Sequence, residues 1–393
     1  MKPELLFVEQ HGELGGGQRI LLSLALSDAV RQRWEPRFAL AERGAFWTEL
    51  EASAIPVDLC PAPRMSNGPK RLSDVLLFAT GFWGQVRWFR RAVQQHPVEF
   101  VYTSSPRFLA QLVLACAGTR TSVVFHLQAF YESCLEERFL AAALGSARVA
   151  LVICPSVAAE AWVHILLSPS KPRVTVSNWL CAELTSAPGG GRAESVRLDT
   201  VARDQFHFGV VGRLVRIKGQ DLFLDAARRL LAQGVRAEFY VIGGEIYASQ
   251  DGYASALRAM HADEPRIHFV GYTSRMESVY QQLSCVVVPS RSEVFGLVAV
   301  EAMYHGVPVI VSDVAELPRI VDGGRCGLVF RSESVEELAA AMRRMLEDRP
   351  LRARLIEQGR RQVEENYRAE PCTGRIAEAL ERARRSPLTR RQS

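Results

Sequence analysis

Lysine is almost absent from this chain. Of its 48 basic residues, four are lysine, at positions 2, 70, 171 and 218, and the rest are arginine. A basic position taken at random would therefore be lysine in only 4 of 48 cases. Lys218 lies inside a motif described below, so its presence there is informative.

Two further absences exclude whole classes of protein. The eight cysteines form no Cys-x-x-Cys pair and several lie in apolar runs, which argues against a disulfide or zinc framework and predicts buried, reduced thiols. The longest uncharged apolar stretches, such as Val75 to Val86, are shorter than the roughly 20 residues of a membrane span. The opening "MKPELLFVEQ" enters a strand directly and shows no signal peptide, so a cytoplasmic location is expected.

The composition is that of a globular protein with more than one core. The 393 residues are 48% hydrophobic and 23% charged, and a chain of this length favours two domains. The net charge of +5 arises in residues 382–393, which carry five arginines and no acid. Such a tail is usually a solvated end and less often a contact for acidic lipid or nucleic acid. No nucleic-acid partner is expected.

Short apolar runs alternate with amphipathic runs along both halves of the chain. Helical patterns such as 19–31 separate most of the apolar runs. This alternation predicts an α/β fold with doubly wound parallel sheets covered by helices on both faces. Strands are expected at 4–10, 37–42, 56–60, 99–105, 122–128, 150–156, 173–178, 206–213, 237–244, 266–271, 285–290, 308–313 and 326–330.

The alternation stops between Cys181 and Asp204, where Gly, Ser, Ala and Pro are frequent, as in a linker. We therefore expect Rossmann-like domains over 1–182 and 206–372, a linker over 183–205, and a helix with a basic tail over 373–393. Ligands of such sheets bind beyond the carboxyl ends of the strands. The loops at those ends, and the cleft between the two domains, are the expected site.

Two of these loops have the composition of phosphate-binding loops. Gly15 to Gly17 follow the first strand and precede a helix, where glycine permits close approach and a helix N-terminus favours an anion. Their spacing is not that of a dinucleotide fingerprint, so a flexible turn is an equal alternative. In "VVGRLVRIKG", Arg213 and Lys218 follow a strand, and two cations on one such loop can bind a diphosphate.

The segment "SEVFGLVAVEAMYHGVPVIVSD" places Glu293 and Glu301 on either side of Phe295, Gly296 and Leu297. A helix beginning near this glycine would point its first amides at phosphate oxygens. Glu301 would then lie one turn into the helix, where it can accept hydrogen bonds from vicinal hydroxyls such as those of a ribose. Glu293, ahead of the helix, could face a sugar.

The motifs "VGRLVRIKGQDLFLDA" and "PSRSEVFGLVAVEAMYHGVPVIVSD" resemble the two signature regions of retaining glycosyltransferases of family 4 (glycosyl transferases group 1), which have the GT-B fold. The second is similar to that family's E-x7-E element. The resemblance extends by pattern to the first glycine loop, to His126 in "VVFH" and to Asn178 in "TVSNWL". It implies transfer of a sugar from a nucleotide-diphosphate-sugar to an acceptor hydroxyl with retention of configuration, in bacterial polysaccharide, glycolipid or glycoconjugate biosynthesis.

The resemblance also implies a role for each matching residue, with the acceptor on the first domain and the donor on the second. No cofactor is implied, and no Asp-x-Asp sequence occurs, which agrees with an enzyme that needs no metal. The implied roles are donor diphosphate for Arg213 and Lys218, transferred sugar for Glu293, backbone amides for Phe295, Gly296 and Leu297, donor ribose for Glu301, donor phosphate or acceptor for Gly16 and Gly17, and the reacting centre for His126.

The chain departs from the family pattern at two places. After the strand at 308–313 the family usually has Gly-Gly followed by Pro-Glu, whereas this chain has Ala315, Glu316, Pro318 and Arg319. His126 is followed by Leu127, where an acidic residue is common. These departures keep a non-catalytic nucleotide-sugar binder open as an alternative, and a nucleotide-sugar epimerase of the same fold is a second alternative. A phosphorylase is disfavoured, because it would need a lysine that carries a cofactor, and of the four lysines only Lys218 lies in a motif.

One helix raises the question of a membrane contact. In "GFWGQVRWFRRAVQ", Phe82, Val86, Phe89 and Val93 form an apolar stripe, with arginines elsewhere around the helix. The favoured interpretation is ordinary packing of this stripe on the sheet. The alternative is peripheral binding to an anionic membrane on its inner face, where a lipid-linked acceptor would lie.

Overall fold

The computed structural model describes residues 2–62, 72–131, 133–181, 205–244 and 252–385. The chain divides into two compact units, Met1–Cys181 together with Ala369–Ser393, and Ala182–Arg368. The predicted linker, apart from residue 205, and the tail beyond residue 385 lie outside the described residues.

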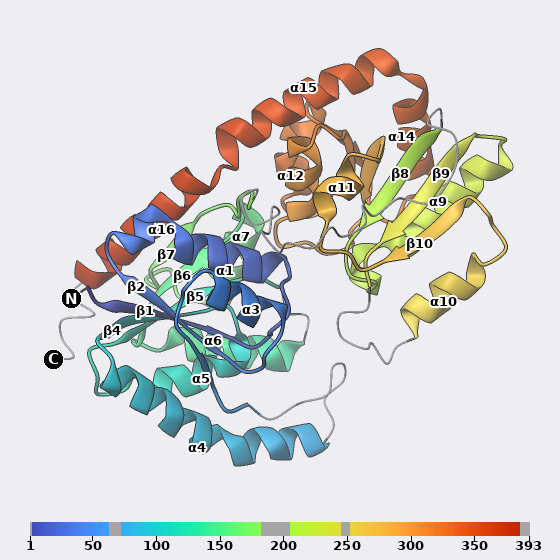
Figure 1. Ribbon diagram of the computed structural model, residues 1–393. Helices are drawn as coiled ribbons and strands as arrows, with labels where there is room; N and C mark the ends of the chain where they lie inside the picture. Colours follow the sequence, from blue (N-terminus) through green and yellow to red (C-terminus); the bar gives the residue numbers. More distant parts are fainter. Residues whose placement is uncertain (1, 63–71, 132, 182–204, 245–251, 386–393) are drawn as a thin grey trace. The chain divides into compact units, whose positions relative to one another are not determined.

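The first unit is built on a parallel sheet (Figure 1). Among its described residues, seven strands run in the order β3-β2-β1-β4-β5-β6-β7. Strand β1 is apolar from Leu5 to Val8, and all four side chains are buried, as expected where helices cover both faces of a sheet. The bounds are β1 Glu4–Glu9, β2 Glu35–Leu40, β3 Val57–Leu59, β4 Val98–Thr103, β5 Ser122–His126, β6 Val149–Cys154 and β7 Arg173–Thr175.

Helices cover both faces of this sheet. In Figure 1, α1 and α16 lie on one face and α4 and α5 on the other. Helix α16 was expected from residue 373 as a segment of its own. It begins at Ala369 and belongs to the first unit, because Ile376 and Leu380 are buried where it contacts α2 and β6. The helices are α1 Gly16–Leu26, α2 Asp28–Arg31, α3 Ala45–Ala52, α4 Leu72–Gln95, α5 Pro106–Ala115, α6 Cys134–Gly145, α7 Val157–Leu166 and α16 Ala369–Arg385.

The apolar stripe of α4 is used for packing. Val86, Phe89 and Val93 are buried, and α4 packs on α5. Trp83 is 60% exposed, but it lies outside the stripe. None of the helices in the described ranges combines the length and hydrophobicity that a membrane span requires.

The second unit repeats the parallel arrangement. In residues 205–244 and 252–368, six strands run in the order β10-β9-β8-β11-β12-β13. The bounds are β8 Phe206–Val211, β9 Ala237–Ile242, β10 Ile267–Gly271, β11 Cys285–Val288, β12 Val309–Ser312 and β13 Leu328–Phe330. The helices are α9 Gln220–Ala232, α10 Tyr253–Met260, α11 Met276–Tyr280, α12 Leu297–Tyr304, α13 Leu317–Ile320, α14 Val335–Glu347 and α15 Arg349–Asn366, with 3₁₀ turns η1 Arg216–Lys218 and η2 Asp322–Gly324.

The core of this unit lies between its sheet and two amphipathic helices. Helix α9 buries Phe223 and Leu230 at helical spacing, and α14 buries Leu338 and Met342 against the same cluster. Ser334 fixes the start of α14, because its hydroxyl accepts a hydrogen bond from the amide of Glu337 at 3.2 Å. This core holds the carboxyl ends of β8 and β11 in place.

The cysteines are free thiols, as predicted, with one correction. Seven of the eight are buried, but Cys134 is exposed. It is the first residue of α6, and it lies in the mostly polar segment "ESCLEER" rather than in an apolar run. The prediction that every cysteine is buried was therefore wrong at this position.

Candidate functional site

The sequence motifs of the second unit meet at two neighbouring loops. Strands β8 and β11 are adjacent and parallel, so the loops that leave their carboxyl ends lie side by side. The amide of Arg291 donates to the carbonyl of Ile217 at 2.8 Å, which ties one loop to the other. The predicted site residues Arg213, Lys218 and Glu293 are all on these two loops.

Gly219 allows the loops to approach so closely. It has a φ of 68°, and a Cβ atom at this position would lie 2.0 Å from the carbonyl oxygen of Pro289. Both the left-handed backbone and the missing side chain are therefore required here. Lys218 directly precedes this residue, so its placement depends on the glycine.

We expect Gly219→Ala to lower the free energy of unfolding by about 2–4 kcal/mol, because the methyl group adds a backbone clash to the left-handed strain. Urea denaturation of the full chain measures this change. Gly234→Ala is the matched control, since Gly234 has a φ of 78° but no atom within 4 Å of its Cβ position. The control should cost only about 1 kcal/mol. Equal losses in the two variants would show that the contact with Pro289 is not required.

Lys218 and Glu293 form an ion pair at this junction. The Nζ of Lys218 lies 2.6 Å from Oε2 of Glu293, and both side chains are largely buried. The hydroxyl of Ser290 also donates to Oε2 of Glu293, at 3.1 Å. A cation and an acid that were predicted to bind different parts of one ligand are therefore in direct contact.

Arg213 lies on the same loop as Lys218, and it is exposed. Its backbone carbonyl accepts a hydrogen bond from Nε2 of Gln220 at 2.7 Å, which fixes the main chain at this point. The guanidinium therefore extends from an anchored backbone, as the predicted contact with a diphosphate requires.

Arg291 anchors the second loop, and nothing in its sequence context indicated this role. Its guanidinium donates to both carboxylate oxygens of Asp221, at 2.7 and 2.8 Å, and it also pairs with Glu333. Burial alone would raise the pKa of Asp221, but hydrogen bonds from Arg291 and Tyr253 outweigh it and lower that pKa. These bonds tie the loop that carries Glu293 to the start of α9, which follows Lys218 in the chain.

Helix α12 begins where the sequence predicted. Gly296 is its N-cap, with a φ of 114°, and Leu297 is its first residue. A Cβ atom on Gly296 would lie 2.5 Å from Cδ2 of Leu317, so the helix start packs tightly against α13. The side chain of Phe295 is buried with its ring 5.7 Å from that of Tyr367. The first amides of this helix can accept an anion.

Glu301 lies one turn into α12, as predicted, and its orientation is fixed. The hydroxyl of Tyr280, the last residue of α11, donates to Oε2 of Glu301 at 2.8 Å. The ring of Tyr280 stacks on His305 with centroids 5.3 Å apart. Tyr280 was missed because no spacing rule links "MESVYQQL" to a glutamate 21 residues later.

The loop after β12, where the family pattern breaks, keeps a glycine-like backbone. Ala315 has a φ of 47°, a left-handed conformation that costs roughly 1–2 kcal/mol for a residue with a side chain. Glu316 is buried, and its Oε1 pairs with Nε of Arg319 at 3.2 Å. A buried acid with its own arginine therefore occupies the place of the second glycine.

The first unit holds the remaining predicted residues. Gly16 begins α1 and is exposed, and Gly17 follows it. His126 ends β5, and its ring is 0% exposed. Burial lowers the pKa of His126 to about 3, so its imidazole is neutral. The predicted contact of His126 with a donor sugar stays a prediction, and the structure leaves no part of this ring open to solvent.

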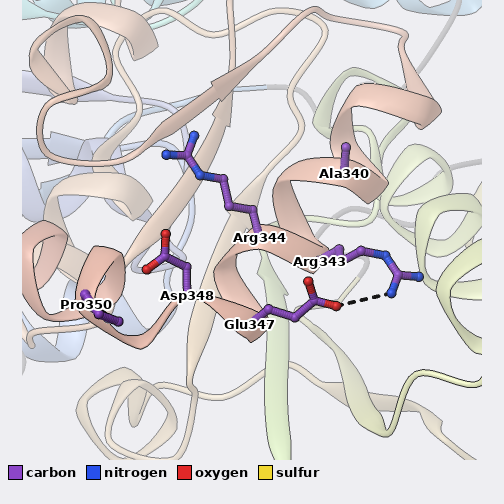
Figure 2. A pocket seen from close by; sticks show the side chains of 6 residues that line it. All are labelled: Ala340, Arg343, Arg344, Glu347, Asp348 and Pro350. Atoms are coloured by element: carbon purple, nitrogen blue, oxygen red, sulfur yellow. Dashed lines mark hydrogen bonds and ion pairs between the residues drawn. The ribbon is translucent and has the colours of Figure 1, made fainter.

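One hollow of this unit is lined by charged side chains that the helix end and an ion pair account for. A surface hollow of about 510 Å³ lies between the end of α14 and the start of α15, and Figure 2 shows Arg343 and Glu347 paired on its wall. Arg343 and Arg344 are near the C-terminal end of α14, where cations stabilise a helix. In the residues the structure describes, no three His, Cys, Asp or Glu side chains gather as a metal site would need. The lining residues of the hollow are Ala340, Arg343, Arg344, Glu347, Asp348 and Pro350.

Residues 198–362 match the family described as "Glycosyl transferases group 1". This segment contains both loops of the site and the whole of α12. The D-inositol 3-phosphate glycosyltransferase of Corynebacterium aurimucosum is 34% identical over 148 residues, which cover 36% of this chain and 35% of that protein. The lipopolysaccharide core biosynthesis mannosyltransferase LpsB of Rhizobium meliloti is 31% identical over 179 residues, covering 44% of this chain and 50% of that protein. The chain thus spans half or less of the length of these relatives.

Solved structures match along almost the whole chain. The Anabaena protein HepE, crystallised in complex with UDP and glucose, has a TM-score of 0.76 at 21% identity and covers 96% of this chain and 99% of its own. Sucrose-phosphate synthase from Thermosynechococcus elongatus has a TM-score of 0.74 at 18% identity, covering 97% and 99%. These matches confirm the predicted fold class, α/β with the two parallel sheets of the GT-B fold.

Proposed function

We propose that the protein is a glycosyltransferase, because residues 198–362 match the family described as "Glycosyl transferases group 1". It moves a sugar from a nucleotide-diphosphate-sugar to an acceptor hydroxyl, with retention of anomeric configuration. The acceptor is a glycan or a lipid-linked glycan of bacterial polysaccharide, glycolipid or glycoconjugate biosynthesis. Two similar proteins, a mannosyltransferase of lipopolysaccharide core biosynthesis and a UDP-binding protein, support this choice.

One observation carries the proposal. Lys218 meets Glu293 at 2.6 Å beside the start of α12, and Glu301 lies one turn further along the same helix. A cation, a row of helix-start amides and two acids thus follow one another within the family segment. This order fits the diphosphate, the sugar and the ribose of a nucleotide-sugar.

The residues would act as follows during transfer. Negative charge grows on the diphosphate as its bond to the sugar breaks, and Arg213 and Lys218 oppose that charge together with the amides at Gly296 and Leu297. Glu301, already oriented by Tyr280, accepts hydrogen bonds from the ribose. Glu293 faces the transferred sugar. No metal enters this proposal, since the two cations neutralise the leaving group.

A thermal-shift screen against UDP-, GDP- and ADP-sugars tests the proposal, because a ligand that binds the native state raises its melting temperature. We expect the sugars of one of the three nucleotides to raise the melting temperature more than the sugars of the other two. Assays of the stabilising donor for released nucleoside diphosphate and for an isomerised sugar then separate a transferase from an epimerase and from a non-catalytic binder. A chain that none of these donors stabilises would contradict the proposal.

A further inference from the structure

Two carboxamide side chains meet at the carboxyl edge of the first sheet. Gln128 follows β5 and Asn178 follows β7. Nδ2 of Asn178 donates to Oε1 of Gln128 at 3.4 Å. Nε2 of Gln128 lies 3.2 Å from Nδ1 and 3.1 Å from Nε2 of His126. The amide of Gln128 is therefore held between the imidazole and Asn178.

The geometry places this amide over the face of the imidazole. A group equally close to both ring nitrogens but in the ring plane would collide with the carbon between them. Gln128 thus covers His126, whose ring is 0% exposed, while Gln128 itself is partly exposed. Gln128, rather than His126, presents a polar group at this surface.

His126 is well suited to support such an amide. The hydroxyl of Tyr102 lies 2.8 Å from Nδ1 of His126, and both residues are fully buried. The two rings meet edge to face, with centroids 5.9 Å apart and planes at 90°. This contact fixes the imidazole ring beneath Gln128, so the amide rests on a rigid base.

Asn178 supplies a second, independent indication of a ligand. Its side chain is only 6% exposed, and within the described residues its Oδ1 accepts no hydrogen bond. A buried amide oxygen without a partner is energetically unfavourable, so a donor that fills this position is favoured. The next residue, Trp179, donates to Ser23 of α1 at 2.9 Å, which fixes the segment next to the helix that Gly17 helps to begin.

We propose that Gln128 and Asn178 form a hydroxyl-binding subsite for a sugar, in which Gln128 makes the contact expected of His126 and His126 is a positioning residue. Oδ1 of Asn178 accepts from the hydroxyl, and the outward N–H of Gln128 donates to it. Both groups are uncharged, which suits a sugar hydroxyl better than a phosphate. The inference rests on the proposed function, since the sugar belongs either to the donor or to the acceptor.

The test compares Gln128→Leu and Gln128→Glu with the parent in two titrations. The donor titration measures the affinity for UDP-glucose relative to UDP by calorimetry. The acceptor titration measures the affinity of the UDP-saturated protein for methyl α-mannopyranoside and methyl α-glucopyranoside by NMR. Gln111→Leu is the control, because Gln111 is another glutamine of the first unit whose side chain is hydrogen-bonded to a carboxamide: its Nε2 donates to Oε1 of Gln85 at 2.9 Å. Melting temperatures identify any variant that fails to fold.

We expect both Gln128 variants to lose about tenfold or more in one titration, with the affinity for UDP and the control unchanged within about twofold. A lower affinity in the donor titration would assign the bound sugar to the donor, and a lower affinity in the acceptor titration would assign it to the acceptor. Gln128 variants with the same affinities as the parent in both titrations would overturn the subsite. A parent protein that binds UDP-glucose no more tightly than UDP, and that binds neither glycoside, would also overturn it. Glycoside binding that depends on Gln128 without nucleotide binding would instead contradict the proposed function and keep the subsite.

A double variant, Tyr102→Phe with His126→Phe, separates positioning from direct contact. It keeps a flat ring beneath Gln128 and removes the buried hydroxyl and its partner together, which limits the loss of stability. A positioning role predicts that the sugar affinity stays within about threefold of the parent. A loss as large as that of Gln128→Leu would assign the contact to His126 and overturn this part of the inference.

Discussion

Replacing Lys218 with alanine is expected to lower the turnover number about a thousandfold. Its ammonium is the cation fixed beside the start of α12, 2.6 Å from Glu293, where charge would grow on the leaving diphosphate. The affinity for UDP should fall less, about tenfold, because the interaction strengthens as the bond breaks. Steady-state assays with the donor found by thermal shift, combined with UDP calorimetry, measure the two effects separately.

Lys171→Ala is the control for this variant. Lys171 is also partly buried, and it donates to the carbonyl of Ser146 at 2.6 Å in the first unit. Burial lowers its pKa to about 8, so the control removes a lysine with a perturbed environment far along the chain from the site motifs. Turnover should stay within about twofold of the parent. Comparable turnover in Lys218→Ala and the parent would refute the diphosphate assignment.

The fold could be predicted from the sequence, because the alternation of short apolar runs with amphipathic runs is repeated along the chain. Each strand in the described residues, from Glu4–Glu9 to Leu328–Phe330, overlaps a predicted one. The errors are at strand ends, because a local pattern does not show where pairing with the neighbouring strand stops: β7 was expected over 173–178 but ends at Thr175. Local patterns could not assign the last helix to the first unit, because that depends on contacts with α2 and β6.

The site was only partly predictable, for a similar reason. Lys218, Glu293, Gly296 and Glu301 lie in motifs whose spacing is set by a strand, a loop and a helix start, so local rules located them. Their supports come from elsewhere: Tyr280 reaches Glu301 from another helix, and Asp221 reaches Arg291 from α9. Such pairs are fixed by the packing of helices on the sheet.

Replacing Glu293 with glutamine is expected to change binding and turnover in opposite directions. In the parent, the carboxylate of Glu293 neutralises Lys218 and competes with a phosphate for it. Without that charge, the affinity for UDP should rise about five- to tenfold, the effect of weakening one partly buried ion pair. Turnover should fall about a hundredfold, because the acid that faces the transferred sugar is lost. Calorimetry with UDP and steady-state assays measure the two changes.

Glu333→Gln distinguishes this contact from a general effect of charge. It removes one negative charge from the same unit, at an exposed partner of Arg291, and does not contact Lys218. Its UDP affinity should therefore stay within about twofold of the parent, since screened surface charges contribute little. Tighter UDP binding in both variants would indicate a long-range effect of net charge. Weaker UDP binding together with lower turnover in Glu293→Gln would show that Glu293 holds Lys218 in its productive position and does not compete with the ligand.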